Sequence, residues 1–404
     1  MKRRHFLTGA GLALLTGQIS SVQPANAPRR SLTLFLCGDV MTGRGIDQIL
    51  GRPSKPHLHE QYVGSALEYV EIAERATGPI ERPAKPAYIW GDALAELERV
   101  RPDARIINLE TAVTTAEDAW PGKGIHYRMH PANASCLTAA RVDCCVLANN
   151  HVLDWGYRGL AETLDTLRTA GIRTVGAGRD DAEAAAPATI ELCNGNRVVV
   201  FAFGMANAGV PDDWAATPRR AGVNLLSDMS GQAAERIARQ VRAVKRSGDV
   251  IVVSLHWGSN WGYAVPEAQR EFAHSLIDTA GVDIVHGHSS HHPKGIEVHR
   301  DRLVLYGCGD FLNDYEGISG HASFRSDLAL MYFATVDAST GELTRTGELT
   351  RLLLTPTRIR HFRVNRARGD EARWLERMLN REGRGLGTSV DRLPDDTLAL
   401  KWRA

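Results

Sequence analysis

Six polar residues that could act as ligands for a metal ion stand where short apolar segments of the sequence end. They are Asp39, Glu110, Asn150, His256, His288 and His291. Carboxylate and amide oxygens, combined with imidazole nitrogens, suit a divalent ion such as Mn, Zn, Fe or Mg. No cysteine belongs to the set, so a structural thiolate zinc site is not expected.

Each of these residues also has an ordinary explanation when it is taken alone. Asp39 could cap a helix, and Glu110 could be a solvated loop residue. The histidines are harder to explain singly, because four of them lie within the seven residues 286–292. The set as a whole therefore favours one shared metal site.

His151 and Asp154 form a candidate acid–base pair beside this set. His151 directly follows Asn150, and Asp154 stands three residues further on. A carboxylate often orients a catalytic imidazole, which would let His151 protonate a leaving group. The alternative for Asp154 is a cap on the helix that follows.

Two arginines are candidates for binding an anionic substrate. Arg44 stands between Gly43 and Gly45, and its guanidinium could hold a carboxylate or phosphate in a two-pronged grip. Its alternative is an exposed turn residue. Arg128 is a second candidate for the same role, with a surface position as the alternative.

Elements that alternate between strand and helix must position these residues. Apolar segments of strand length cover residues 32–37, 104–109, 144–148, 198–203, 250–255, 282–285 and 303–306. Amphipathic patterns between them predict helices over residues 159–170, 232–246 and 266–280. This alternation predicts an α/β fold, in which residues that follow strands meet at one edge of a sheet.

Two regions depart from this alternation. Residues 52–90 are an insertion over or beside the site, with one helical stretch over residues 63–76. After residue 318, strands are expected over residues 328–336 and 349–355, followed by a short helix over 371–379. A glycine- and arginine-rich stretch then begins at Arg381, and we expect it and the final residues to be loosely held.

Composition excludes several classes of protein. The chain has 404 residues, of which 43% are hydrophobic and 24% charged, as in globular proteins rather than disordered chains, collagens or coiled coils. The 48 basic and 47 acidic residues give a net charge of +1, which argues against a dedicated nucleic-acid binder. The six cysteines form no CxxC pair and indicate small buried residues rather than a disulfide framework.

The N-terminus has the layout of an export signal over residues 1–27. A basic head with Arg3 and Arg4 precedes an apolar run, and Ala25-Asn26-Ala27 is similar to a cleavage site. The paired arginines resemble the twin-arginine variant. We therefore expect a periplasmic or extracellular protein. Pro28 disfavours cleavage at this site, so anchoring by an uncleaved signal is the alternative.

Motifs in a fixed order carry a resemblance to a known family. They are Gly38-Asp39-Val40-Met41-Thr42-Gly43-Arg44, Asn108-Leu109-Glu110, Ala148-Asn149-Asn150-His151-Val152-Leu153-Asp154-Trp155-Gly156, His256-Trp257-Gly258, Gly287-His288-Ser289-Ser290-His291 and Gly295-Ile296-Glu297-Val298. The chain resembles the CapA or PgsA family of capsule and poly-γ-glutamate synthesis, which is itself similar to calcineurin-like metallophosphoesterases. The resemblance implies a four-layer α/β/β/α sandwich in residues 31–318, with strands in residues 319–404 that complete it, plus a tail.

The motifs also differ from those of calcineurin-like phosphoesterases. That superfamily opens with an Asp-x-His pair, where this chain has Asp39-Val40-Met41. Glu110 stands where an aspartate is usual, and two residues rather than one separate His288 from His291. The resemblance assigns the six polar residues as ligands and His151 as the general acid, and it leaves the number of ions open.

The resemblance implies a role with an anionic polymer such as poly-γ-glutamate, or with a small anionic substrate. The implied chemistry is metal-assisted hydrolysis of an amide or a phosphate. The alternatives are a non-catalytic polymer-binding or assembly subunit with a degenerate metal site, and a structural protein with a vestigial one. Membrane-bound polymer synthase subunits are the implied protein partners.

Overall fold

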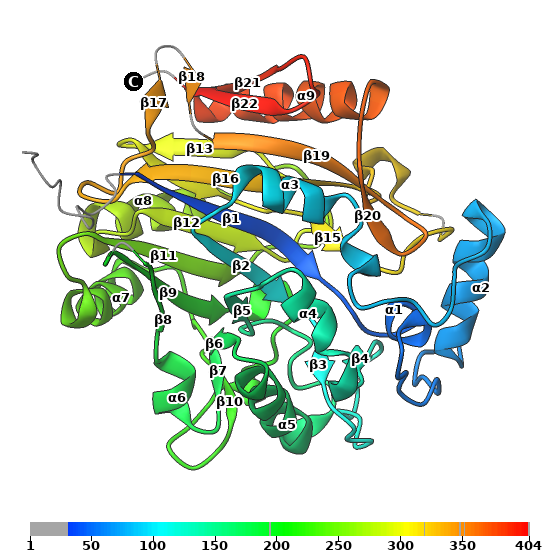
Figure 1. Ribbon diagram of the computed structural model, residues 1–404. Helices are drawn as coiled ribbons and strands as arrows, with labels where there is room; N and C mark the ends of the chain where they lie inside the picture. Colours follow the sequence, from blue (N-terminus) through cyan, green and yellow to red (C-terminus); the bar gives the residue numbers. More distant parts are fainter. Residues whose placement is uncertain (1–30, 194, 319, 347–348, 351, 403–404) are drawn as a thin grey trace, which may run out of the picture.

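The computed structural model describes residues 31–402, apart from residues 194, 319, 347–348 and 351. The export signal expected over residues 1–27 lies outside the described residues. Two β-sheets pack face to face, and helices cover their outer faces (Figure 1). The expected α/β/β/α sandwich is therefore confirmed.

The larger sheet has ten strands in the described part of the chain. Its path runs through β21 (Thr388–Arg392), β22 (Leu398–Trp402), β19 (Leu352–Arg360), β16 (Leu328–Asp337), β1 (Ser31–Val40), β2 (Ala104–Leu109), β5 (Cys144–Val146) and β6 (Arg173–Val175). Beside this path, β15 (Asp310–Leu312) pairs with β1, and β20 (Arg363–Arg366) pairs with β19. The pairs from β1 to β6 are parallel, so their carboxyl ends share one edge.

The smaller sheet has six strands in the order β13 (Ile296–His299), β14 (Arg302–Leu305), β12 (Ile284–His288), β11 (Asp249–His256), β9 (Arg197–Gly204) and β8 (Ala188–Glu191). Three two-stranded pairs complete the described strands. They are β3 (Ala112–Val113) with β4 (Arg128–Met129), β7 (Ala177–Gly178) with β10 (Gly222–Val223), and β17 (Arg345–Thr346) with β18 (Leu349–Thr350).

The helices of the described residues differ in length and place. They are α1 (Gly45–Ile49), α2 (Ala66–Thr77), α3 (Ala93–Val100), α4 (Ser135–Ala139), α5 (Gly156–Thr169), α6 (Asp181–Ala185), α7 (Gly231–Val244), α8 (Glu267–Ala280) and α9 (Asp370–Gly383). The helices predicted over 159–170, 232–246 and 266–280 correspond to α5, α7 and α8, with ends that differ by a few residues.

The central strands of the smaller sheet are apolar on both faces because each face meets a different layer. Along β9, Val199, Phe201 and Phe203 pack with α7 and α8, whereas Val198 and Val200 pack toward the other sheet. The sequence of a strand that is buried on both faces is a continuous run of apolar residues. This run is the pattern from which β9 was predicted.

The insertion at residues 52–90 contains α2, which lies at one end of the molecule (Figure 1). The helix begins at Ala66 rather than at the predicted residue 63. The reason is a cap: the Ser65 hydroxyl accepts a hydrogen bond from the backbone of Leu67, and Glu68 accepts one from the backbone of Ser65.

The C-terminal residues that the structure describes, up to Trp402, are not loosely held, and for them that prediction is wrong. Strands β21 and β22 form an antiparallel hairpin at the edge of the larger sheet, paired to β19. Val390, Leu398 and Leu400 are buried there. The arginines and glycines that precede the hairpin belong to the end of α9 and a 3-10 turn, and they hid this apolar pattern.

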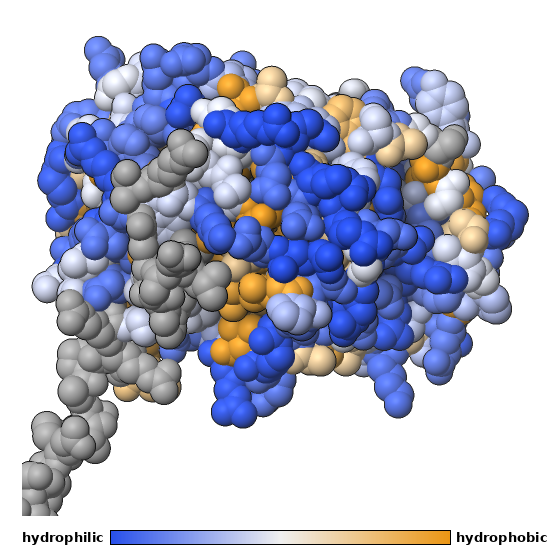
Figure 2. All heavy atoms as spheres, turned by 90° about the horizontal axis from the view of Figure 1, so that it is seen from above, coloured by the Kyte–Doolittle hydropathy of each residue, from blue (hydrophilic) through white to orange (hydrophobic). Residues whose placement is uncertain are grey.

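The cysteines and the surface agree with a globular chain. Five cysteines are buried and free, and Cys193 is free and exposed. Hydrophilic residues cover most of the face seen in Figure 2, with small hydrophobic patches between them. Among the described residues, no helix combines the length and the apolar character needed to cross a bilayer.

Candidate metal centre

The carboxyl ends of strands from both sheets meet at the candidate site. Asp39 lies near the end of β1, in register with Asn108 of β2 and Asp310 of β15. His256 and His288 end β11 and β12 and face each other in register. Because side chains alternate along a strand, His256 lies on the same face as Val252, which packs toward the larger sheet. Both histidines therefore point between the sheets.

Three side chains form the core of the site. Ligand atoms of Asp39, His256 and His288 all lie within 4.8 Å of one another, and all three residues are buried. The Nδ1 atoms of His256 and His288 are 2.8 Å apart, and His288 Nδ1 is 3.9 Å from Asp39 Oδ1. Asn150 Oδ1 lies 3.0 Å from His256 Nε2. This set of nitrogen and oxygen donors fits a divalent ion.

The protonation of the two histidines also suits metal binding. Burial lowers the pKa of His256, and the nearby His151 and His291 lower it further. Burial, with the charge of His256, lowers the pKa of His288. Both imidazoles are therefore neutral at pH 7, which is the form that binds a metal.

Two further carboxylates surround Asp39. Asn108 donates from Nδ2 to Asp39 Oδ1 at 2.8 Å and to Glu110 Oε2 at 3.1 Å, which holds these two side chains together. Burial and the charge of Asp310 raise the pKa of Asp39 to about 7. Burial and the charge of Asp39 raise the pKa of Glu110. A cation among these carboxylates would favour their charged forms.

His291 joins the cluster through Asp310, a residue that the sequence analysis did not name. His291 Nδ1 lies 2.9 Å from Asp310 Oδ1, and Asn313 donates to the other carboxylate oxygen at 2.9 Å. Burial opposes the charge on His291, but the Asp310 carboxylate outweighs it and raises the pKa of His291. All six predicted ligands thus lie in one network with Asp310, in which Asn150 and His291 are partly exposed and the others are buried.

His151 borders this network and is oriented by Asp154. His151 Nδ1 lies 2.7 Å from Asp154 Oδ2, and its Nε2 lies 3.8 Å from Glu110 Oε1. Donation from Nδ1 to the carboxylate leaves Nε2 facing the cluster. Burial lowers the pKa of His151 to about 4, because it outweighs the opposing effect of the Asp154 carboxylate and is reinforced by the charge of Lys123. Asp154 does not cap α5, because Trp155 occupies the cap position.

Lys123 is another residue that the sequence analysis missed. Its Nζ forms an ion pair with Asp154, donates to the backbone oxygen of Asn150, and lies 3.1 Å from His151 Nδ1. It stands in a glycine-flanked loop with no strand or motif around it, so no pattern in the sequence pointed to it.

The two predicted anion-binding arginines are both buried and already engaged. Arg44 is 4% exposed and donates to Asp314 and to Glu60. Arg128 is 7% exposed, donates to backbone oxygens of Ala116 and Lys55, and stacks on a tryptophan ring. Neither is the exposed residue that the alternative described. Their partners belong to this chain, and a role with substrate stays a prediction.

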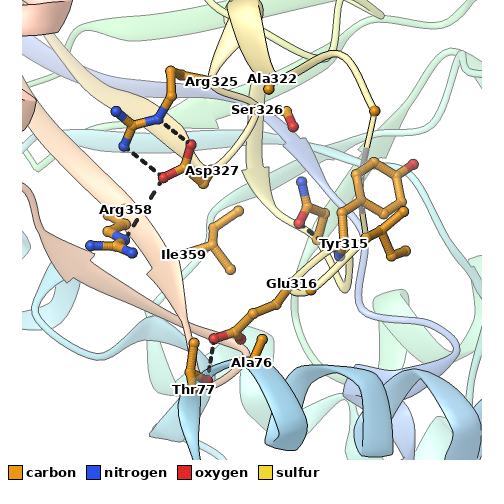
Figure 3. A pocket seen from close by; sticks show the side chains of 14 residues that line it. Ala76, Thr77, Tyr315, Glu316, Ala322, Arg325, Ser326, Asp327, Arg358 and Ile359 are labelled. Atoms are coloured by element: carbon orange, nitrogen blue, oxygen red, sulfur yellow. Dashed lines mark hydrogen bonds and ion pairs between the residues drawn. The ribbon is translucent and has the colours of Figure 1, made fainter.

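A cavity of about 410 Å³ lies on the far side of Asn313 from Asp310. Asn313, which donates to Asp310, is one of its lining residues. Figure 3 shows Arg325, Asp327 and Arg358 linked by ion pairs on one wall, and Glu316 bonded to Thr77 on another. None of the six candidate ligands lines this cavity, and Asn313 links it to Asp310.

Comparisons with known proteins agree with the motifs. The family model described as bacterial capsule synthesis protein PGA_cap matches residues 33–315. A probable polyglutamine synthesis accessory protein of Mycobacterium tuberculosis is 46% identical over 370 residues, which cover 91% of this chain and 96% of that protein. The capsule biosynthesis protein CapA of Bacillus anthracis is 24% identical over 283 residues, covering 70% and 60% respectively.

Among solved structures, a phosphatase from Mycoplasma pneumoniae aligns with a TM-score of 0.42 at 10% identity, covering 80% of this chain and 94% of that one. The family model spans more than half of the sequence, and the mycobacterial relative matches nearly all of it. The resemblance to the CapA family is therefore confirmed, and the chain belongs to the bacterial capsule synthesis protein family PGA_cap.

Proposed function

We propose that this protein is an exported, metal-dependent hydrolase that acts in the synthesis or processing of an anionic capsule-type polymer such as poly-γ-glutamate. The printed names of its relatives, capsule biosynthesis and polyglutamine synthesis accessory proteins, support the polymer context. The observation that carries the chemistry is the buried convergence of Asp39, His256 and His288 within 4.8 Å.

In this proposal Asp39, Asn150, His256 and His288 hold a divalent ion, with Glu110 and the Asp310–His291 pair beside them. When bound, such an ion supplies a water of lowered pKa and polarises the amide or phosphate to be cleaved.

His151 acts on the leaving group. Its Nε2 faces the cluster and is unprotonated while Nδ1–H donates to Asp154, so Nε2 can take up the proton released by the attacking water and pass it to the departing atom. Asp154 fixes the orientation of the ring, and Lys123 holds Asp154 and the backbone of Asn150 in place.

One observation favours a second candidate, a polymer-binding subunit without turnover. Met41 stands where metallophosphoesterases carry a histidine, and its side chain is buried, with Sδ 3.7 Å from the Tyr315 hydroxyl. A thioether is a poor ligand for hard divalent ions, so the site has one ligand fewer from this motif.

Turnover separates the two candidates. Purified protein, loaded in turn with Mn, Zn, Fe or Mg, is incubated with phosphoesters and with γ-glutamyl amides. Metal-dependent hydrolysis that disappears in His256→Ala but persists in His299→Ala supports the hydrolase. His299 is the control because it is a histidine outside the cluster, bonded to Asp278. Tight metal binding without hydrolysis of either class contradicts the hydrolase and supports the binding subunit.

Export and assembly belong to the same proposal. The basic and apolar layout of residues 1–27 supports delivery to the periplasm or the exterior, with anchoring by an uncleaved signal as the variant form. Membrane-bound polymer synthase subunits are the proposed protein partners.

A further inference from the structure

Arg44 lies in a cage of aromatic and acidic side chains between β1 and α2. Its Nε donates to Asp314 Oδ2 at 3.2 Å, and its second terminal nitrogen donates to Asp314 Oδ1 at 2.5 Å. The guanidinium carbon lies 4.0 Å from the centre of the Tyr69 ring and 4.6 Å from that of Tyr127. Asp314 thus neutralises the arginine and occupies one edge of its fork.

The remaining edge of Arg44 binds a second carboxylate. Its other terminal nitrogen lies 3.0 Å from Glu60 Oε1 and 2.9 Å from the Tyr69 hydroxyl. The Tyr69 hydroxyl donates in turn to Glu60 Oε2. Both oxygens of Glu60 are therefore bound, although Asp314 already balances the charge of Arg44. The edge made by Arg44 and Tyr69 is a built carboxylate site.

Glu60 reaches this site from an exposed loop tip, residues 59–63. His59, Gln61 and Tyr62 are exposed, and Tyr62 is 93% exposed, whereas the Glu60 side chain is 8% exposed. Hydrogen bonds close the loop below the tip, from Leu58 to Gly64 and from Ala66 to Pro56. Among the described hydrogen bonds, those of Glu60 are the ones that tie the tip to the rest of the chain. The ring of His59 also lies near the rings of His126 and Trp155, and Val63 packs against the cluster that contains Tyr69. The Glu60 side chain can therefore leave the site by a local change of the tip that does not unwind α2.

The side chains of Tyr127 and Tyr315 lie between the carboxylate site and the candidate metal centre. The Tyr127 ring, which faces Arg44, lies 4.5 Å from the His151 ring. The Tyr127 hydroxyl lies 3.0 Å from that of Tyr315, whose ring lies 5.7 Å from His291. A ligand with repeated carboxylates could place one unit at the metal centre and a neighbouring carboxylate in the cage.

We propose that Arg44 and Tyr69 form a subsite for a glutamyl carboxylate of the polymer, and that Glu60 fills this subsite when the polymer is absent. This inference rests on the proposed function for its ligand class. It also explains how a buried, paired arginine can still take part in substrate binding: the incoming carboxylate replaces Glu60, and Asp314 stays in place.

Glu60 then lowers the apparent affinity for the polymer, because the ligand binds only to the fraction of molecules with a vacant subsite. Glu60→Gln removes the competing charge and keeps the shape of the side chain. Glu60→Asp shortens the side chain by one methylene and so moves its carboxylate away from Arg44 and Tyr69. If Glu60 fills the site nine-tenths of the time, its loss raises the apparent affinity about tenfold.

The test is calorimetric titration of the full chain with a γ-glutamyl oligomer in the presence of a chelator. Glu60→Gln and Glu60→Asp should each bind the oligomer about tenfold tighter than the unchanged protein does. The same oligomer with its carboxylates amidated should show no such gain. Glu71→Gln is the matched control, since Glu71 is an exposed glutamate of the same insertion that pairs with Arg75. Adding Tyr69→Phe to Glu60→Gln should remove most of the gain.

An affinity that is unchanged or weaker in both Glu60 variants overturns the inference. So does failure of both variants to fold, since Glu60 would then be part of the framework. Binding is measured without metal and without turnover, so a gain in affinity supports the subsite even if no hydrolysis is found. Hydrolysis of phosphoesters without any binding of the oligomer contradicts the subsite but agrees with the proposed hydrolase activity.

Discussion

The Nδ1 atoms of His256 and His288 lie 2.8 Å apart because the two residues end neighbouring parallel strands in the same register. Two imidazoles whose nitrogens face each other at this distance need a shared proton or a shared cation between them. Burial lowers the pKa of both rings and so keeps each of them neutral, which allows one N–H hydrogen bond between them in the metal-free protein and leaves their lone pairs available to a cation. The Asp39 carboxylate, 3.9 Å from His288 Nδ1, makes the position suitable for a cation.

The metal ligands can be tested singly. We expect His256→Ala and Asn150→Ala to weaken metal binding at least tenfold, since even residues that only support ligands contribute 10–100-fold. Neither side chain belongs to the hydrophobic clusters, so both variants should fold. Elemental analysis after equilibrium dialysis, with far-ultraviolet circular dichroism for the fold, measures both effects. Full metal occupancy in both variants would remove these residues from the site.

The raised pKa of Asp39 predicts that the free energy of unfolding of the metal-free protein depends on pH. Its folded pKa of about 7 lies above its ordinary value of 3.8, so the folded chain holds a proton that the unfolded chain releases. This contribution to stability is complete below about pH 4 and is lost as the pH rises through 7. Asp39→Asn should remove it, so the difference in free energy of unfolding between the two proteins should change over this window. A difference that is constant from pH 4 to 8 in chelator-treated samples contradicts the buried carboxylate cluster.

His151 should be needed for turnover and not for metal binding. Its ring is held by Asp154 and faces the cluster, and it is not one of the three converging ligands. We expect His151→Ala to keep the metal and to lower kcat by about 10²–10⁴-fold, the usual contribution of a general acid. Steady-state kinetics of metal-loaded protein provide the measurement. Loss of the metal together with activity would instead identify His151 as a ligand.

The buried pairing of Arg44 with Asp314 predicts a stability effect. Arg44→Lys keeps the charge and loses the two-pronged contact. We expect the free energy of unfolding to fall by about 1.5–3 kcal/mol, the range for a charged hydrogen bond, with metal content intact. Urea unfolding measures this loss. Arg158→Lys is the control, because that side chain is 81% exposed, and equal stability of the two variants would mean that the Arg44 contact contributes little.

Export through the twin-arginine route predicts a simple phenotype. Replacing Arg3 and Arg4 together by lysine should trap the protein in the cytoplasm as a precursor. Fractionation and immunoblotting report the location and the length of the chain. Unchanged export in the double variant contradicts this route. Deletion of the apolar run then tests secretion by another route.

The sequence allowed the strands and the ligand positions to be predicted where local pattern and position coincide. His256 and His288 follow buried apolar strands, so their meeting at one edge followed from the fold class. Asp310 was missed because it begins the short strand β15 instead of following an apolar segment, and a single aspartate after Gly309 carries no spacing signal. Its partner His291 lies 19 residues away on another loop.

Other parts of the site depend on contacts that no local pattern encodes. Asp314 meets Arg44 across 270 residues of sequence, and Lys123 reaches Asp154 from a loop without periodicity. Arg44 binds a carboxylate of its own chain, whose identity is set by tertiary packing, and its role with substrate stays a prediction. The edge hairpin of β21 and β22 was hidden for a different reason, since arginines and glycines precede it.

Anomalous diffraction from crystals of the metal-loaded protein tests the central claim most directly. The account predicts a peak between the two sheets, about 2.0–2.2 Å from a carboxylate oxygen of Asp39 and from ring nitrogens of His256 and His288. No peak at this position in protein soaked with Mn or Zn, or a peak only at surface histidines such as His299, would contradict it.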